Sequence, residues 1–93
     1  MELPVISNYG HHSSDNYGVH TLCIEFGGSL DLYYSYQTIV AYRDAKDGLV
    51  VHENIWGPTT GKHLNWISKD HKSRFPAEQF DAKLKADLAR HIK

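Results

Sequence analysis

The sequence has 93 residues, of which 41% are hydrophobic and 23% are charged, and its net charge is −1. This length predicts a single domain over residues 1–93, large enough to be stable without a disulfide or a structural metal, and the composition argues against intrinsic disorder. No apolar run approaches the roughly 18 residues of a membrane span, and no leader resembles a secretion signal. We therefore expect a cytoplasmic protein without a membrane partner.

Charge is distributed unevenly along the chain. Residues 1–60 carry two basic and seven acidic side chains, a net −5, whereas residues 61–93 carry eight basic and four acidic ones, a net +4. This asymmetry is a hint about partners rather than about the fold. The single cysteine, Cys23, excludes an internal disulfide, and its place in an alternating apolar run predicts a buried, unreactive thiol.

The first 18 residues have no clear periodicity. "ELPVIS" is compatible with an edge strand, whereas "NYGHHSSDNYG" is rich in turn-forming residues. We interpret residues 1–18 as a loop, with an edge strand as the alternative.

Alternating apolar and polar residues predict two strands at 19–26 and 29–36. Gly27 and Gly28 lie between them and suit a tight hairpin turn, because glycine adopts positive φ angles without strain. On the second strand, Leu30, Leu32, Tyr34 and Tyr36 share one face. The two segments therefore form the start of an antiparallel meander.

The alternation continues from residue 37 to Arg43. We expect either one long strand that bends near Gln37 or two strands that meet at a bulge there. "DAKDG" is typical of a turn, and residues 49–55 read as the next strand. The middle of the chain thus predicts a meander of about four to five strands.

The C-terminal region carries the most regular helical pattern, over residues 76–92. Pro76 suits the first turn of a helix, and Phe80, Leu84 and Leu88 recur at a helical spacing. The apolar stripe needs a surface to cover, and the sheet offers one. The expected fold is α+β, with the C-terminal amphipathic helix packed on the meander.

The segment "WGPTTGKHLNWI" (56–67) resembles a phosphate-binding loop at first sight. Such a loop needs four residues between its glycines and a Ser or Thr after its lysine. Here three residues separate Gly57 from Gly61, and His63 follows Lys62. We therefore predict no nucleotide hydrolysis.

A short capped helix explains the same segment better. Pro58 ends the preceding strand, Thr59 or Thr60 caps the helix, and Leu64 with Ile67 forms its buried side. The start of this helix, beside Lys62 and His63, is a weaker candidate for binding an anion.

Seven histidines invite a metal site, but their spacing does not support one. The sequence has no HExxH, no HxH and no Cys/His cluster, so we predict neither a metal nor a cofactor. His20 and His52 fall on predicted strands and are interpreted as hydrogen-bonded structural residues or as exposed side chains. The carboxylates Glu25, Asp31 and Glu53 are interpreted as solvated charges, with an acid/base pair as the alternative.

Aromatic residues are numerous for so short a chain. Exposed rings on a sheet can stack on unpaired bases, but tyrosine and tryptophan also fill small cores and dominate protein interfaces. The near-neutral charge favours protein docking over nucleic-acid stacking. The rings concerned are Tyr33, Tyr34, Tyr36, Tyr42, Trp56 and Trp66.

Two stretches carry a resemblance to a known family. "SYQTIVAYRD" (35–44) and "ENIWGPTTGKHLNWI" (53–67), followed by "RF" and an amphipathic helix, resemble small uncharacterised proteins of bacteriophages and mobile elements. Their pattern is roughly SYxTxVA, then ENxWxxTTGKHLN, and the match covers residues 17–90. The resemblance implies signature positions without assigned roles: Asn54, Trp56, Thr59, Thr60, Gly61, Lys62, His63, Leu64 and Asn65.

What the resemblance implies about function is a context. Small phage proteins of this size often bind a host protein, including components of immune systems. We therefore expect a non-enzymatic accessory protein that binds a host macromolecule and inhibits host defence, as anti-CRISPR proteins do. The candidate binding residues are Tyr34, Tyr36, Trp56, Thr60, Lys62, His63, Asn65, Trp66, Lys69, Lys72 and Arg74.

Three alternatives stay open from the sequence. The basic segment from Lys62 to Arg74 can contact nucleic acid. An enzyme acting on a phosphorylated small molecule would use His63 and Lys62 with a carboxylate such as Glu53. An edge strand can also support a homodimer through sheet pairing.

Overall fold

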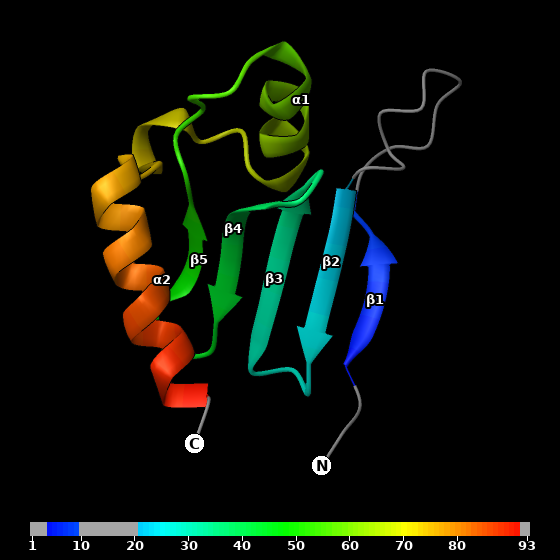
Figure 1. Ribbon diagram of the computed structural model, residues 1–93, viewed down its shortest axis with the longest axis vertical. Helices are drawn as coiled ribbons and strands as arrows, with labels where there is room; N and C mark the ends of the chain where they lie inside the picture. The colour runs from blue at the N-terminus through cyan, green and yellow to red at the C-terminus, as the bar shows by residue number, and fades with distance from the viewer. Residues whose placement is uncertain (1–3, 10–20, 92–93) are drawn as a thin grey trace.

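A computed structural model describes residues 4–9 and 21–91 (Figure 1). Within them, five strands form one sheet in the order β1-β2-β3-β4-β5, and each strand is antiparallel to its neighbour in sequence. The α+β class, the meander and the C-terminal helix are confirmed. The elements are β1 (Val5–Asn8), β2 (Thr21–Phe26), β3 (Leu30–Ser35), β4 (Thr38–Asp44), β5 (Gly48–Val51), α1 (Pro58–Ile67), the 3₁₀ turn η2 (His71–Ser73) and α2 (Ala77–His91).

Strand β1 forms the outer edge of the sheet. It pairs with β2 from Val5 opposite Glu25 to Asn8 opposite Leu22. The loop interpretation was therefore wrong for these four residues, and the edge strand is right, because the β-branched Val5 and Ile6 favour extended backbone. The turn-rich remainder, residues 10–18, lies outside the described residues.

The chain reverses direction at Tyr36 and Gln37, where a single long strand was one prediction. Ser35 pairs with Thr38, so only two residues connect β3 to β4. Tyr36 adopts a φ of 57°, a left-handed conformation that few residues other than glycine accept. The uninterrupted apolar alternation concealed this hairpin, because its turn contains neither Gly, Pro, Asn nor Asp.

A β-bulge does occur, but inside the β3–β4 pair. Tyr33 is opposite Ala41 and Tyr34 is opposite Ile39, so Val40 is the extra residue. The bulge places Ile39 on the same side as Tyr42, whereas strict alternation had grouped Ile39 with Ala41. The extra residue therefore changes which face of the sheet the side chain at the start of β4 points to.

Strand β5 is shorter than predicted. It ends at Val51, and His52 then forms an isolated parallel bridge with Phe75 instead of continuing the ladder to Ile55. The side chain of Asn54 turns the chain by accepting hydrogen bonds from the backbone N–H groups of Trp56 and Gly57. The turn at Asn54 therefore ends β5, and Pro58, the predicted end of the strand, comes later in the chain.

Two cores lie on opposite faces of the sheet. Neighbouring strand residues point to opposite sides, so Tyr42 and Val50 face one core while Ala41 and Val51 face the other. The first core includes Phe80 of α2, with Leu84 and Leu88 packed against it. The second includes Leu64 of α1, with Ile67 beside it, as predicted.

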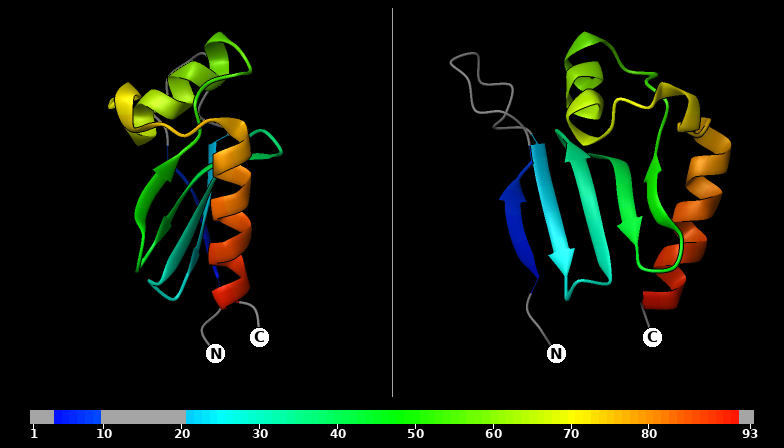
Figure 2. Two further views of the ribbon diagram at one scale, coloured as in Figure 1. Left: turned by 90° about the vertical axis from the view of Figure 1, so that its left-hand side faces the viewer. Right: turned by 180° about the vertical axis from the view of Figure 1, so that it is seen from behind.

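The helices are placed differently relative to the strands. Helix α2 runs alongside β5, whereas α1 lies across the end of the sheet where β3 joins β4 (Figures 1 and 2). None of the described helices is long and apolar enough to cross a bilayer. The half of the sheet formed by β1 and β2 lies away from both helices (Figure 2).

Candidate functional site

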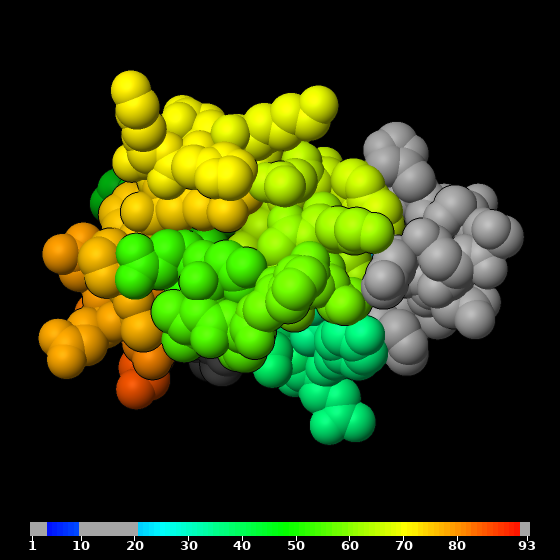
Figure 3. Space-filling model, turned by 90° about the horizontal axis from the view of Figure 1, so that it is seen from above, coloured from blue at the N-terminus to red at the C-terminus, as the bar shows by residue number. Residues whose placement is uncertain are grey.

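A pocket of about 190 Å³ opens where the β3–β4 turn meets the start of α1. It brings together both stretches that the sequence analysis singled out, one from β3 and β4 and one from the segment around α1. Figure 3 views the molecule from this end and shows the two segments side by side. The lining residues are Ser35, Tyr36, Thr38, Val40, Trp56 and Thr60.

Two exposed aromatic side chains line the pocket. Tyr36 is 48% exposed and Trp56 is 40% exposed, which is unusual for rings of this size. Tyr36 lies at the tip of the hairpin with a positive φ, and its ring lies 5.9 Å from that of His63. We call Tyr36 and Trp56 the aromatic rim.

Trp56 is held in place by its surroundings. Asn54 Oδ1 accepts hydrogen bonds from the N–H groups of Trp56 (3.0 Å) and Gly57 (3.2 Å), and Asn54 Nδ2 donates to the Gly57 carbonyl at 3.0 Å. The Trp56 ring lies 4.6 Å from that of His52, which in turn contacts the buried Phe80 at 4.8 Å. A chain of rings therefore connects the exposed indole to the core.

Two of the lining residues, Ser35 and Thr60, belong to a buried polar chain that continues to His63. Ser35 Oγ lies 3.0 Å from Thr60 Oγ1 and 2.7 Å from His63 Nδ1, and all three residues are buried. These bonds attach α1 to the end of β3. The sequence analysis missed Ser35, although its position at the start of the first motif was a signal that the two motifs meet.

Thr60 does not cap α1, in contrast to the prediction. The helix begins at Pro58 with Gly57 as its N-cap, and among the described residues no side chain caps it. Proline lacks an N–H, so one of the N–H groups that the first turn of a helix leaves unpaired is absent. The hydroxyl of Thr60 is instead committed to Ser35.

The other predicted binding residues divide by burial. Trp66 is half-buried with its ring 5.5 Å from His63, and Tyr34 is half-buried against the α2 core. Lys62 is exposed while His63 has no exposed surface, so these two neighbours do not present a joint site to solvent. Glu53 is exposed.

Part of the basic segment forms an internal clamp, a set of hydrogen bonds that connect α1 to the residues that follow it. Arg74 Nη2 donates to Asn65 Oδ1 at 2.9 Å and to the Ser68 carbonyl at 3.1 Å, and His71 Nε2 lies 2.9 Å from the same Asn65 oxygen. Burial lowers the pKa of Arg74. Asn65 and Arg74 thus hold η2 against α1, and the three lysines of this stretch, Lys62, Lys69 and Lys72, are exposed.

Residues 2–82 match a family of unknown function, DUF8033. The chain belongs to this family. Both stretches that form the pocket fall inside the matched range. Searches of curated proteins and of solved structures found no match.

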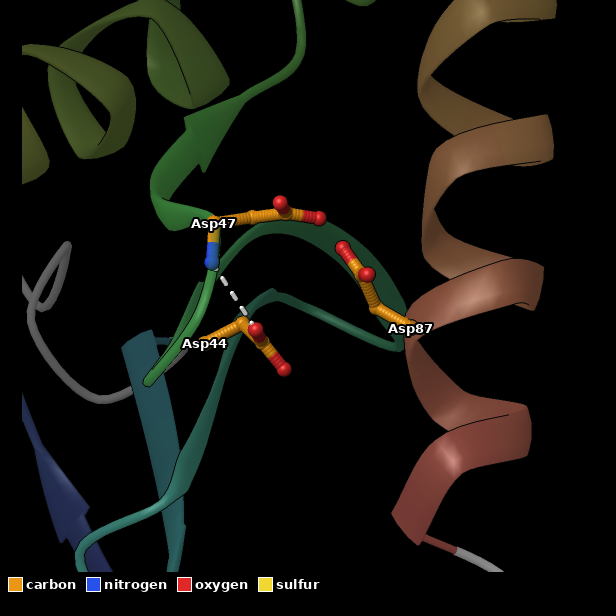
Figure 4. Close-up of side chains that lie close together, drawn as sticks. All are labelled: Asp44, Asp47 and Asp87. Carbon is orange, nitrogen blue, oxygen red and sulfur yellow. Dashed lines mark hydrogen bonds between the residues drawn. The ribbon is translucent and has the colours of Figure 1, made fainter.

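A second polar cluster lies far from the pocket, between the β4–β5 turn and α2. Asp44, Asp47 and Asp87 place carboxylate oxygens within 4.8 Å of one another (Figure 4), a grouping that the sequence analysis did not anticipate. Each carboxylate has a basic partner, since Arg90 bonds to all three and Lys83 also bonds to Asp47.

This cluster fastens α2 to the sheet. Asp44 also accepts a 2.8 Å hydrogen bond from His91 and two from the backbone of its own turn, and the His91 bond is the main reason that its pKa lies far below the ordinary value. Burial raises the pKa of Tyr42 to about 12, so its hydroxyl remains a donor to Asp87. The arrangement neutralises charge within the fold.

The remaining polar predictions are placed as follows. His52 is buried, and its Nδ1 lies 2.6 Å from the Glu53 carbonyl, which confirms a structural role, whereas His20 lies outside the described residues. Glu25 and Asp31 are opposite each other on β2 and β3, and Asp31 is also opposite Arg43.

Proposed function

We propose that this protein is a binding module that docks another protein against the aromatic rim and the pocket beside it. The observation that carries the proposal is the pair Tyr36 and Trp56, both substantially exposed and both lining one pocket. Tyrosine and tryptophan are the residues most enriched among interface hot spots, and anchoring pockets lie next to them. The adjoining Ile55, 60% exposed, enlarges the apolar surface.

Rigidity supports the same proposal. A ring that is already fixed loses little conformational entropy on binding. The Tyr36 ring packs against His63 and the Trp56 ring against His52, while Asn54 holds the backbone of Trp56. The structure therefore maintains two large apolar side chains at the surface, where burial would be the default.

The resemblance to small phage proteins suggests who the partner is. We propose a phage or mobile-element accessory protein that acts in the host cytoplasm on a host protein, with a component of host defence as the leading target. Protein is favoured over nucleic acid because Arg74 and Asn65 bond to each other, and because none of the described lining residues is charged.

Affinity capture with matched variants tests the proposal. Trp56→Ala should reduce recovery of a specific host protein and weaken its affinity at least tenfold in calorimetry with the purified partner, a typical hot-spot loss. Phe26→Ala is the matched control, since Phe26 is 39% exposed but ends β2 beside Leu30, at the opposite end of the β2–β3 pair from Ser35. Equal recovery by wild type and a folded Trp56→Ala variant contradicts the proposal.

The nucleic-acid alternative is tested in parallel. Fluorescence anisotropy with single-stranded and duplex DNA and RNA at two salt concentrations reports contacts to phosphates. If Lys69→Ala with Lys72→Ala abolishes such binding and Trp56→Ala does not, the basic segment is the working surface instead.

A further inference from the structure

The chemistry of the pocket specifies what its occupant must be. A volume of about 190 Å³ is below the roughly 300–1,000 Å³ typical of pockets for drug-sized ligands and cofactors. It suits a group the size of one side chain. Neither of its rim residues nor any other described lining residue is charged, so a buried cation or anion would have no counter-charge there.

The walls favour a ring. Tyr36 and Trp56 provide two aromatic surfaces at one pocket, and aromatic rings attract one another in offset and edge-to-face geometries beyond the effect of buried area. Val40 adds an apolar wall. An aliphatic side chain would fill the pocket but would make no aromatic contact with Tyr36 or Trp56.

The polar lining residues add a further requirement. Ser35 has one proton and two lone pairs, and it bonds to both Thr60 and His63. In a hydrogen-bond chain that runs in one direction through these three residues, Ser35 donates one hydrogen bond and accepts another. These two bonds use its proton and one of its lone pairs, which leaves one lone pair on Ser35. The hydroxyl of Thr38 supplies another acceptor.

We propose that the pocket receives a single tyrosine side chain of the bound protein, with the Ser35–Thr38 wall accepting its hydroxyl proton. This inference rests on the proposed function and specifies the partner's anchor. A phenylalanine has the ring but not the donor, and an arginine has donors but brings a charge. The proposal therefore predicts a rank order among single amino acids.

Titration of amino-acid amides into ¹⁵N-labelled protein tests the rank order. N-acetyl-tyrosinamide should produce saturable shifts at Tyr36, Thr38 and the Trp56 indole in the millimolar range. N-acetyl-phenylalaninamide should bind three- to tenfold more weakly, and the leucine and arginine amides should not saturate. Equal binding of the tyrosine and phenylalanine amides, or tighter binding of the arginine amide, would overturn the proposal.

Two variants test the polar wall. Ser35→Ala should remove the difference between the tyrosine and phenylalanine amides. Thr38→Val, at an exposed position that leaves the Ser35–Thr60–His63 chain intact, should reduce that difference if Ser35→Ala fails to fold. If both folded variants keep the full difference, the wall does not accept the hydroxyl and the proposal fails.

The outcome is separable from that of the proposed function. Loss of host-protein capture in Trp56→Ala, combined with no amide binding, leaves the docking surface in place and rejects only the tyrosine anchor. Amide binding with unaffected capture in Trp56→Ala rejects the docking surface, and with it the tyrosine of a docked protein, and leaves only a pocket that binds a phenol.

Discussion

The hydroxyl of Tyr42 on β4 donates a 2.5 Å hydrogen bond to Oδ2 of Asp87 on α2. Both residues are buried, and 45 positions separate them in the sequence. The bond joins the centre of the sheet to the C-terminal helix, next to the edge-to-face contact between Tyr42 and Phe80.

Tyr42→Phe should lower the free energy of unfolding by about 1–3 kcal/mol, because it leaves the buried Asp87 carboxylate without this donor while keeping the ring. Urea denaturation followed by circular dichroism measures the change. Tyr36→Phe is the control, because Tyr36 is exposed, and it should change stability by less than about 0.5 kcal/mol. Equal effects of the two substitutions would show that the Tyr42 bond contributes little.

Acid should weaken the attachment of α2 through Asp44. The folded-state pKa of Asp44 lies below its ordinary value of 3.8, mainly because of the His91 hydrogen bond. Stability from this group is therefore fully present above about pH 4 and declines as the pH falls toward the lower folded-state value.

Asp44→Asn should lower stability at pH 7 and flatten its decline below pH 4, as measured by denaturant titrations between pH 2 and pH 7. Asp31→Asn, which removes a half-buried carboxylate from the sheet, serves as the control. An unchanged slope in Asp44→Asn would mean that other groups control acid unfolding.

Asn65 and Arg74 should behave as a coupled pair. Their hydrogen bond is partly exposed to solvent, so Asn65→Ala and Arg74→Ala should each cost about 1 kcal/mol, and the double variant should cost less than the sum. Arg74→Lys should not restore stability, because the lysine side chain is shorter and lacks the planar guanidinium that brings Nη2 within reach of both Asn65 and the Ser68 carbonyl. Additive effects in thermal unfolding would contradict the clamp.

Tyr36→Asn should separate binding from stability. Asparagine accepts the left-handed conformation that Tyr36 adopts at a φ of 57°, so the variant should still fold with the same β3–β4 turn, although the ring contact with His63 is lost. Capture of the partner should nevertheless decrease at least tenfold. If a folded variant binds the partner as tightly as wild type, Tyr36 does not contribute to binding.

Cys23 should be unreactive in the native protein. Burial is the main reason that its pKa rises to about 11, with the carboxylates of Asp31 and Glu25 adding to the shift. Relative to the ordinary value of 9.0, this lowers the thiolate fraction at pH 8 about 100-fold. Reaction with a thiol reagent should be correspondingly slow in buffer and fast in guanidinium, and rapid native labelling would contradict the buried placement.

The sequence predicted those parts of the fold that follow from local periodicity. The stripe of Phe80, Leu84 and Leu88 identified α2, and Gly27 with Gly28 located a hairpin that has φ angles of 59° and 80° at these positions. The β3–β4 hairpin was missed because Tyr36 carries the turn without a turn-forming residue. The bulge at Val40 was misplaced, because a bulge depends on pairing between strands rather than on the alternation within one.

The candidate site was predictable in its location but not in its internal arrangement. Trp56 and Tyr36 were proposed as binding residues, and both line the pocket. Thr60 also lines the pocket, with its hydroxyl bonded to Ser35. His63 and Asn65 were assigned to the same surface, although His63 faces inward to Ser35 and Asn65 bonds to Arg74. Helical spacing indicates which residues share a face, but the partner of that face comes from a strand far away in the sequence.

The consecutive order of the strands has a consequence for how the chain folds. Each hydrogen-bonded pair joins neighbours in sequence, so the described hairpins β2–β3, β3–β4 and β4–β5 each close a short loop. Low contact order of this kind favours fast folding, and during synthesis these hairpins can pair in turn as they leave the ribosome. The contacts of Asp44 with Arg90 and His91 need the last residues of α2. Docking of this helix is therefore the step that must wait until the last turn of α2 has been synthesised.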